Sequence, residues 1–246
     1  MRLRVLLCLF LSALGAGTVQ AQVLKLAANE RLAEQFVASR LLKAIYAQAG
    51  LGLQIESMPA ARASLETVQG LRDGEVARIA AYGQRNPELI RVATPYYHLT
   101  SQAFWMKSRQ LAVADRGDLR RYSLGSIRGV AHSTELIKDH PAVTLTKEPL
   151  HMFRMLRAGR FDLTLDTGIN GQYLIARHHW YDIESSPELA RLDLFHYLHP
   201  RHAALAPRID QSIRQLRDRG ALERLRSQAE AELLLVDLDT FTGLQK

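Results

Sequence analysis

The apolar positions in the first part of the chain follow two different periods. Between residues 30 and 49 they recur about every four positions, which predicts an amphipathic helix capped by Asn29 and closed by Gly50. Short or alternating apolar runs at residues 23–28, 53–58, 70–79 and 90–92 predict strands, and residues 60–69 predict a second helix. This part of the chain is therefore expected to alternate between strands and helices.

The same alternation returns after residue 122. The pattern predicts strands at residues 122–127, 143–146 and 161–165, a helix from Ser133, its expected cap, to about residue 140, and a helix at residues 149–158. In both halves a Gly-x-x-Asp segment, at residues 70–73 and 159–162, follows a helix and precedes a strand. Strands and helices joined by short connections predict an α/β fold with mostly parallel sheets covered on both faces.

Two apolar and aromatic segments are candidates for strands that cross between the halves, residues 103–107 and 194–199. After the second, Pro207 is expected to open a helix, and another helix is expected from Ala221 onward. The prediction is a first lobe of residues 22–102 and 200–246, and a second lobe of residues 108–193. The first lobe would thus be discontinuous in sequence.

The N-terminus has the pattern of an export signal. Arg2 and Arg4 precede an apolar run, and residues 19–21 form a small-residue cleavage site, so we expect residues 1–21 to be removed. The apolar run is shorter than the ~20 residues of a membrane span, which makes an uncleaved anchor the less favoured alternative. Cleavage would leave 225 residues, lower the formal charge from +7 to +5 and discard Cys8, the single cysteine. We therefore expect a soluble, monomeric periplasmic protein without a disulfide or a lipid anchor.

Several segments together carry a resemblance to a known family. They are Ile45-Tyr46 with Gly50, residues 59–64, residues 70–78, residues 89–92 leading to Pro95-Tyr96, residues 159–162 and residues 205–225. In this order and spacing the chain resembles bacterial periplasmic solute-binding proteins of family 3, which include the amino-acid-binding components of transporters, and within them an uncharacterised branch. The resemblance implies a type II periplasmic-binding-protein fold whose lobes close over a small polar or anionic solute, with no cofactor. It also implies an inner-membrane partner, either an ABC transporter permease or a sensor.

The resemblance does not extend to the family's amino-acid clamp. In the amino-acid binders an arginine before the Pro-Tyr corner holds the ligand carboxylate, and an acidic residue in the second lobe holds the amino group. Here Asn86 occupies the first position, with Arg85 beside it, and Thr167 occupies the second, with Asp166 one residue earlier. Because one residue along a strand changes the face on which a side chain lies, amino-acid specificity is not implied.

Four residues of the predicted first lobe are candidates for binding a ligand. Arg62 follows the end of a strand and Pro59, where the loops of an open parallel sheet form the ligand crevice. Arg78 is a second guanidinium that could hold a carboxylate, and on a regular strand Glu75 would face away from it. Tyr96 and Tyr97 offer flat apolar surfaces with polar tips. A surface arginine, a structural ion pair and ordinary packing are the alternatives for these residues.

The second lobe contributes the remaining candidates. Arg128 and Ser133 flank a glycine turn ahead of an expected helix start, where free N–H groups could hold an anion or Ser133 could act as a cap. Asp166 and Thr167 end a strand at the same crevice, and the aspartate would suit a ligand amine.

Other chemistries are less favoured by the sequence. His196, His199 and His202 are interrupted by Pro200 and lack further ligands, so no metal site is expected. Scattered basic residues argue against nucleic-acid binding. Relatives of the resembled family include dehydratases of cyclohexadienyl acids, and for that alternative Glu30, Glu75 and Asp166 are the available carboxylates. A sensory or interaction domain without a solute of its own is the third alternative.

Overall fold

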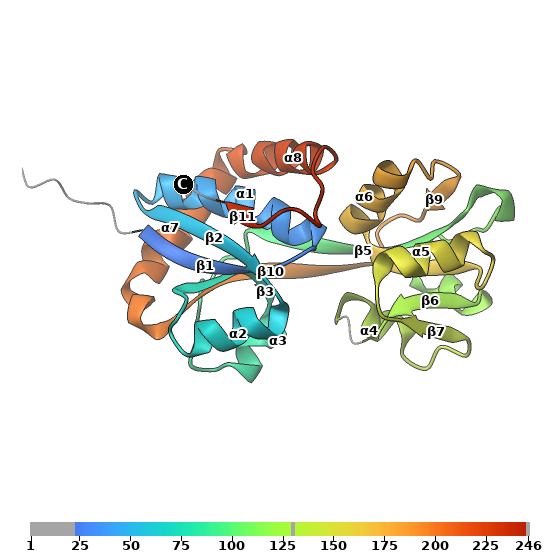
Figure 1. Ribbon diagram of the computed structural model, residues 1–246, viewed down its shortest axis with the longest axis horizontal. Coiled ribbons are helices and arrows are strands. Elements are labelled where there is room, and N and C mark those ends of the chain that lie inside the picture. Colours follow the sequence, from blue (N-terminus) through green and yellow to red (C-terminus); the bar gives the residue numbers. More distant parts are fainter. Residues whose placement is uncertain (1–22, 129–130, 245–246) are drawn as a thin grey trace, which may run out of the picture.

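The computed structural model describes residues 23–128 and 131–244. The predicted export signal with Cys8 lies outside these residues, as do Gly129 and Val130 of the predicted glycine turn. Figure 1 shows two lobes side by side, connected by two long strands, β5 (Tyr97–Met106) and β10 (Ala190–Leu198). No helix in the described part of the chain has the length and apolarity needed to cross a membrane.

The lobe on the left of Figure 1, called lobe 1, contains both ends of the described chain. Its strands lie in the order β11-β2-β1-β3-β10, and β1 is parallel to both β2 and β3. Its elements are β1 (Val23–Asn29), α1 (Ala33–Gln48), β2 (Gly52–Met58), α2 (Ala60–Val68), β3 (Gly74–Ile79), α3 (Ala80–Arg85), β4 (Ile90–Arg91), α7 (Ala206–Asp218), α8 (Ala221–Leu233) and β11 (Gly243–Leu244). In Figure 1, α1, α7 and α8 lie together while α2 and α3 lie below the strands, so helices cover both faces of the sheet.

The lobe on the right, lobe 2, continues the same sheet through β5-β8-β6-β7. The strand β6 is parallel to β7 and β8, whereas β5 is antiparallel to β8 and to β10. The elements of this lobe are β6 (Leu124–Ile127), α4 (Ala131–Ile137), β7 (Val143–Thr146), α5 (Pro149–Arg157), β8 (Leu163–Thr167), α6 (Gly168–His178) and β9 (Ile183–Ser185). The predicted α/β architecture with mostly parallel sheets is confirmed.

The Gly-x-x-Asp segments form equivalent connections in the two lobes. Gly70 and Gly159 each follow a helix with a positive φ, of 75° and 69°, which glycine adopts without steric cost. The carboxylate of Asp73 then accepts the backbone N–H of Lys25 at 2.7 Å, and that of Asp162 accepts the N–H of Ser123 at 2.9 Å. In each lobe the aspartate thus fixes the start of one strand beside its neighbour.

Several element boundaries differ from the prediction. Asn29 does not cap α1, because it is the last residue of β1 and the helix begins after Leu32. Ser133 is likewise not a cap, because α4 already begins at Ala131. The strand predicted at residues 70–79 begins only at Gly74, because the residues before it form the turn fixed by Asp73.

Other elements were not predicted at all. The helices α3 and α6 and the strand β9 are additional, and the crossing strand β5 begins six residues earlier, at Tyr97. The predicted crossing segments 103–107 and 194–199 overlap the last part of β5 and of β10. The exact lobe boundaries stay predictions.

Candidate functional site

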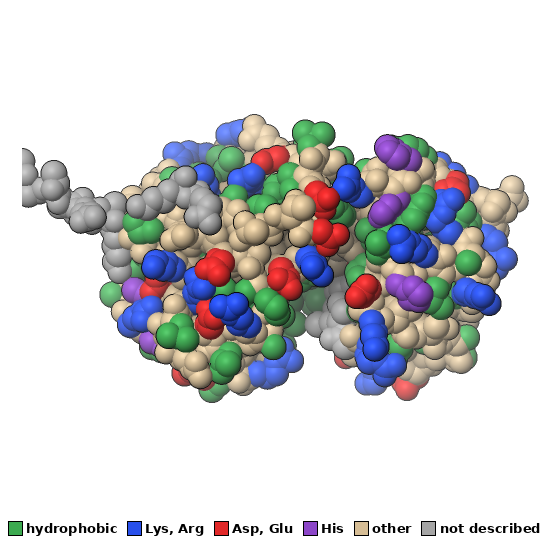
Figure 2. Space-filling model, viewed as in Figure 1, with side chains coloured by type: hydrophobic (Ala, Val, Ile, Leu, Met, Phe, Trp, Pro, Cys, Tyr) green, Lys and Arg blue, Asp and Glu red, His purple; other side chains and the backbone are tan. Residues whose placement is uncertain are grey.

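The carboxyl ends of the parallel strands approach one another between the lobes. In Figure 1, β1, β2 and β3 point towards lobe 2, and α4, which follows β6, lies on the side of lobe 2 that faces lobe 1. Figure 2 shows a hollow between the two lobes at this level. In open α/β sheets ligands bind in such a crevice, outside the carboxyl ends of the strands.

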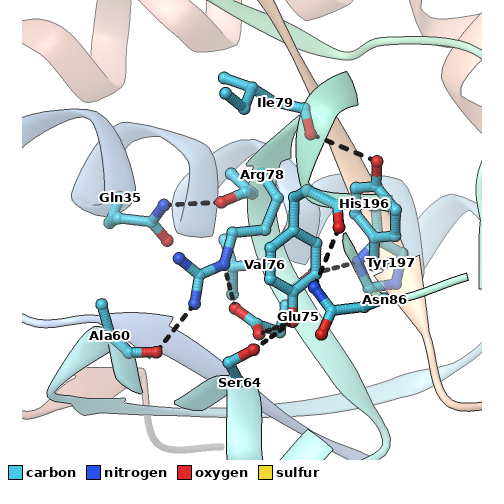
Figure 3. A network of polar contacts seen from close by, with 12 residues as sticks. Gln35, Ala60, Ser64, Glu75, Val76, Arg78, Ile79, Asn86, His196 and Tyr197 are labelled. Carbon is cyan, nitrogen blue, oxygen red and sulfur yellow. Dashed lines mark hydrogen bonds and ion pairs between the residues drawn. The ribbon is translucent and has the colours of Figure 1, made fainter. Parts of the chain in front are cut away.

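Arg78 is the most tightly held of the predicted residues at this edge. Its Nε donates a hydrogen bond to Glu75 Oε2, and the two side chains are only 14% and 2% exposed. Its Nη2 also donates to the carbonyl oxygen of Ala60 at 3.2 Å, at the start of α2 (Figure 3). A guanidinium carries more N–H donors than these two contacts use.

The prediction that Glu75 and Arg78 face opposite sides of the strand is wrong. In the ladder between β3 and β10, Phe195 is paired with Arg78 and Tyr197 with Glu75, so three steps on β3 match two steps on β10. This irregularity is a β-bulge, and its extra residue turns the following side chain to the other face of the strand. Arg78 therefore lies on the same side as Glu75.

A small polar network holds this ion pair in place. The Tyr82 hydroxyl donates to Glu75 Oε1 at 2.5 Å and lies 2.9 Å from the Ser64 hydroxyl, which donates to it. The Arg78 guanidinium lies 4.8 Å from the centre of the Tyr82 ring. Burial and the neighbouring Glu75 raise the pKa of the Tyr82 hydroxyl, which keeps it a hydrogen-bond donor. Arg78 is therefore oriented before any ligand arrives.

Arg62 lies on the first turn of α2, next to this network. Its side chain is 58% exposed, and its Nε donates to Glu66 Oε1 at 2.6 Å, one helical turn along. Glu66 also accepts from Arg72 Nε at 2.8 Å. Of the predicted arginines, Arg62 is thus paired but accessible at the end of β2.

Asp166 and Thr167 are buried at the end of β8, with 4% and 2% of their surfaces exposed. Asp166 Oδ2 accepts from the Asn170 side chain at 2.6 Å, and Oδ1 accepts the Thr167 N–H at 2.7 Å. The Thr167 hydroxyl accepts the N–H of Asn170 and thereby caps α6. Burial outweighs these hydrogen bonds and raises the pKa of Asp166 to about 7, with a further contribution from the charge of Glu34.

Glu34 brings a lobe 1 carboxyl to the same region. It lies in the first turn of α1, and its charge acts on Asp166 of lobe 2 and on Tyr97 of the connecting strand. Burial raises the pKa of Glu34 itself. Burial thus raises the pKa of one carboxyl in each lobe.

The structure does not bring the other predicted residues to the Arg78 network. Tyr96 is buried and donates its hydroxyl to the Val76 carbonyl at 2.8 Å, and Tyr97 is buried with its hydroxyl bonded to Glu230. Ser133 is buried in lobe 2 and accepts the Ser126 hydroxyl at 3.0 Å. Arg128 is exposed after β6 and lines a separate groove of lobe 2.

Two of the three histidines singled out in the sequence, His196 and His202, are held in structural contacts. His196 Nδ1 lies 2.7 Å from the Glu75 carbonyl and must donate to it, so Nε2 accepts the Tyr46 hydroxyl at 2.8 Å. Burial lowers the pKa of His196 to about 4. His202 lies 2.6 Å from Asp73. Across the described residues, no group of three or more acidic, histidine or cysteine side chains could hold a metal ion.

Sequence reasoning missed three residues of this region, Tyr82, Asn170 and Glu34. Tyr82 and Asn170 lie on the helices that were not predicted, α3 and α6. A tyrosine seven residues after a buried glutamate is no recognisable signal in a sequence. Glu34 was available as the acidic residue in the first turn of α1.

Comparison with known proteins identifies the fold. No family model matches the chain. An uncharacterised protein from Shewanella oneidensis is 28% identical over 192 residues, which is 75% of this chain and 72% of that protein. An amino acid ABC transporter substrate-binding protein from Streptococcus pneumoniae, bound to L-arginine, superimposes with a TM-score of 0.63 over 87% of this chain and 97% of its own, at 16% identity. The chain has the type II periplasmic-binding-protein fold.

Further solved structures with this fold include both a transporter binding protein and a sensor domain. A probable extracellular binding protein of an amino-acid ABC transporter from Bacillus subtilis matches with a TM-score of 0.70, at 12% identity, over 85% of this chain and 98% of its own. A histidine kinase sensor domain matches with a TM-score of 0.64, at 17% identity, over 85% and 95%. At these identities the likeness shows the periplasmic-binding-protein fold, in agreement with the resemblance found in the sequence.

Proposed function

We propose that the chain binds a small polar solute with a negative group between its two lobes. The observation that carries the proposal is the guanidinium of Arg78, which is held by two hydrogen bonds near the carboxyl end of β3. Glu75 and the Ala60 carbonyl orient it, so little side-chain entropy is lost when a carboxylate binds. Arg62, on the adjacent first turn of α2, would supply a second, accessible guanidinium.

The opposite side of the hollow would hold the polar remainder of the solute. Asp166 and Thr167 lie at the end of β8, and Glu34 lies nearby at the start of α1. With raised pKa values these carboxyls donate hydrogen bonds when protonated and accept an amine when ionised. The arrangement therefore favours amino-acid-like solutes or hydroxylated organic acids.

The predicted export signal would place the protein in the periplasm. Two roles after solute binding are compatible with the fold, delivery to a transporter and a report to a membrane sensor. Binding proteins of ABC transporters and a histidine kinase sensor domain both occur among the solved structures with this fold. Closure of the lobes over a solute changes the surface that a membrane permease or a sensor would contact. We propose delivery to a transporter as the output, with a report to a membrane receptor as the second candidate.

The proposal is tested by thermal unfolding in the presence of amino acids, organic acids and short peptides. A solute at about 100 times its Kd stabilises the folded protein by ~2.7 kcal/mol, or about 5–10 °C for a chain of this length. Arg62→Ala removes one charge-assisted contact and is expected to weaken the Kd of the solute found by about 10-fold or more. Arg78→Lys keeps a cation beside Glu75 but loses the planar fork, and should weaken binding similarly.

The matched control is Arg214→Ala. Arg214 is 59% exposed and pairs with Asp210 one helical turn away, as Arg62 pairs with Glu66, but it lies on α7. Its removal should leave the Kd unchanged. Equal affinities in wild type, Arg62→Ala and Arg78→Lys would refute the assignment of the site.

A further inference from the structure

A groove in lobe 2 combines features that the solute site does not use. It has a volume of about 500 Å³ and is lined mainly by residues of β7 and α5. Within the described residues β7 is the last strand of the sheet, so the groove lies along an open sheet edge. Pockets of ~300–1,000 Å³ are the usual size for small-molecule sites.

One wall of the groove is partly apolar. Leu150 and Met155 of α5 are partly buried and pack against the main hydrophobic core. The strand side is formed by β7, including Thr144 and Leu145, which are both exposed. An apolar group placed here would be removed from water on several sides.

The same groove is surrounded by positive charge. Arg128 follows β6, Lys147 follows β7, and Arg154 lies on the face of α5 that also carries Leu150 and His151. The single acidic side chain in the lining is Glu148. In addition, Glu148 makes no side-chain cap for α5, so the positive end of the helix dipole adds to the potential.

These cations lack the carboxylate partner that many arginines of the described chain have. Elsewhere arginines such as Arg72, Arg157 and Arg226 are each within ion-pair distance of a carboxylate. Among the ion pairs of the described residues, none involves Arg128, Lys147 or Arg154. Three cations without an acidic partner thus surround a partly apolar cavity.

We propose that this groove is a second binding site, for a small amphipathic anion with an aliphatic body and a carboxylate or similar head group. The aliphatic body lies against Leu150 and Met155, and the head group accepts hydrogen bonds from Arg128, Lys147 and Arg154. All of these residues belong to lobe 2, so the site needs neither lobe closure nor Arg62 and Arg78.

The test is isothermal titration of the full protein with sodium decanoate, compared with acetate and with decylammonium. Decanoate should bind, and both acetate, which lacks the chain, and decylammonium, which has the opposite charge, should bind at least 10-fold more weakly. Lys147→Glu/Arg154→Glu reverses two exposed charges and should weaken decanoate binding at least 10-fold. Hydrogen exchange should show protection by decanoate at residues 144–155.

The control is Lys138→Glu/Arg160→Glu. It makes the same charge change on exposed residues of lobe 2 that do not line the groove, and should change the affinity less than twofold. Circular dichroism and thermal unfolding check that both double variants are folded. Equal weakening by the two double variants, equal binding of acetate, protection elsewhere or no binding of decanoate would each overturn the proposal.

Discussion

Asp166 is a buried residue that makes the stability of the protein depend on pH. It is 4% exposed near the end of β8, and its pKa is raised to about 7 chiefly by burial. The native state therefore keeps a proton that the unfolded chain releases near pH 4. Between these two values the stability falls as pH rises, because the native state binds more protons than the unfolded state.

We expect Asp166→Asn to remove this dependence. The unfolding free energy of the variant, relative to wild type, should rise by about 2–4 kcal/mol between pH 4.5 and pH 8. Urea unfolding of both proteins at several pH values measures this difference in unfolding free energy. The buried neutral His196 has the opposite pH dependence, but it is present in both proteins, so its effect cancels in the difference. A difference that stays constant over this range would contradict a protonated Asp166.

The orientation of Arg78 towards Glu75 is a part of the site that the local sequence could not predict. The position of Arg78 near the end of a strand was predicted, but its partner was not, because the bulge that turns it towards Glu75 depends on pairing with β10. Residues Glu75 and Tyr197, which fix the register, are more than a hundred positions apart in the chain. A local hydrophobic period carries no information about such a register shift.

The helix α6, which begins at the candidate site, packs closely against the connecting strand β5. Gly171 of α6 lies so close to Phe104 of β5 that a Cβ built on it would be 2.1 Å from the aromatic ring. At Gly168, a Cβ would be 2.4 Å from Gln102 Oε1. These glycines let the helix that begins beside Asp166 and Thr167 lie directly on a strand that connects the lobes.

We expect Gly171→Ala to destabilise the protein by about 1–3 kcal/mol through overpacking, although alanine favours helices by ~1 kcal/mol. Phe104→Leu should relieve the clash, so the two substitutions together should cost at least about 1 kcal/mol less than the sum of the single costs. Urea unfolding of the four proteins in this cycle measures the coupling. Strictly additive costs would show that the contact does not constrain α6.

The same glycines explain why some elements were missed. Residues 168–178 contain two glycines and an asparagine, which lower helix propensity, and α3 is only six residues long. The helix α1, with its clear apolar period, was predicted with the correct end before Gly50, although its start was placed three residues too early. Local propensity was overruled where tertiary packing, here against Phe104, determined the structure.

At the scale of the whole molecule, the two lobes are connected through β5 and β10 alone among the strands of the continuous sheet. In the described residues the lobes also meet where α1 packs against α6. A two-strand connection with few further contacts permits rotation of one lobe against the other. The bound solute would then stabilise the closed arrangement of the lobes.

Small-angle X-ray scattering tests whether the lobes close when the solute of the proposed function binds. Saturating wild type with the solute found by thermal unfolding should reduce the radius of gyration and the maximum dimension. At a solute concentration equal to the wild-type Kd, where wild type is half saturated, Arg62→Ala should stay close to the dimensions of the free protein. If the solute binds without any change in scattering, the expected closure of the lobes is wrong.

The strand β11 has a consequence for the order in which the protein can fold. It pairs Gly243 and Leu244 with β2, so a strand from the end of the described chain completes a sheet begun near its start. During synthesis, lobe 2 has all of its strands between residues 97 and 198 available before lobe 1 does. The lobe that carries Arg62 and Arg78 therefore reaches its final structure last, and its open sheet edge stays exposed for almost the whole time that the chain is being made.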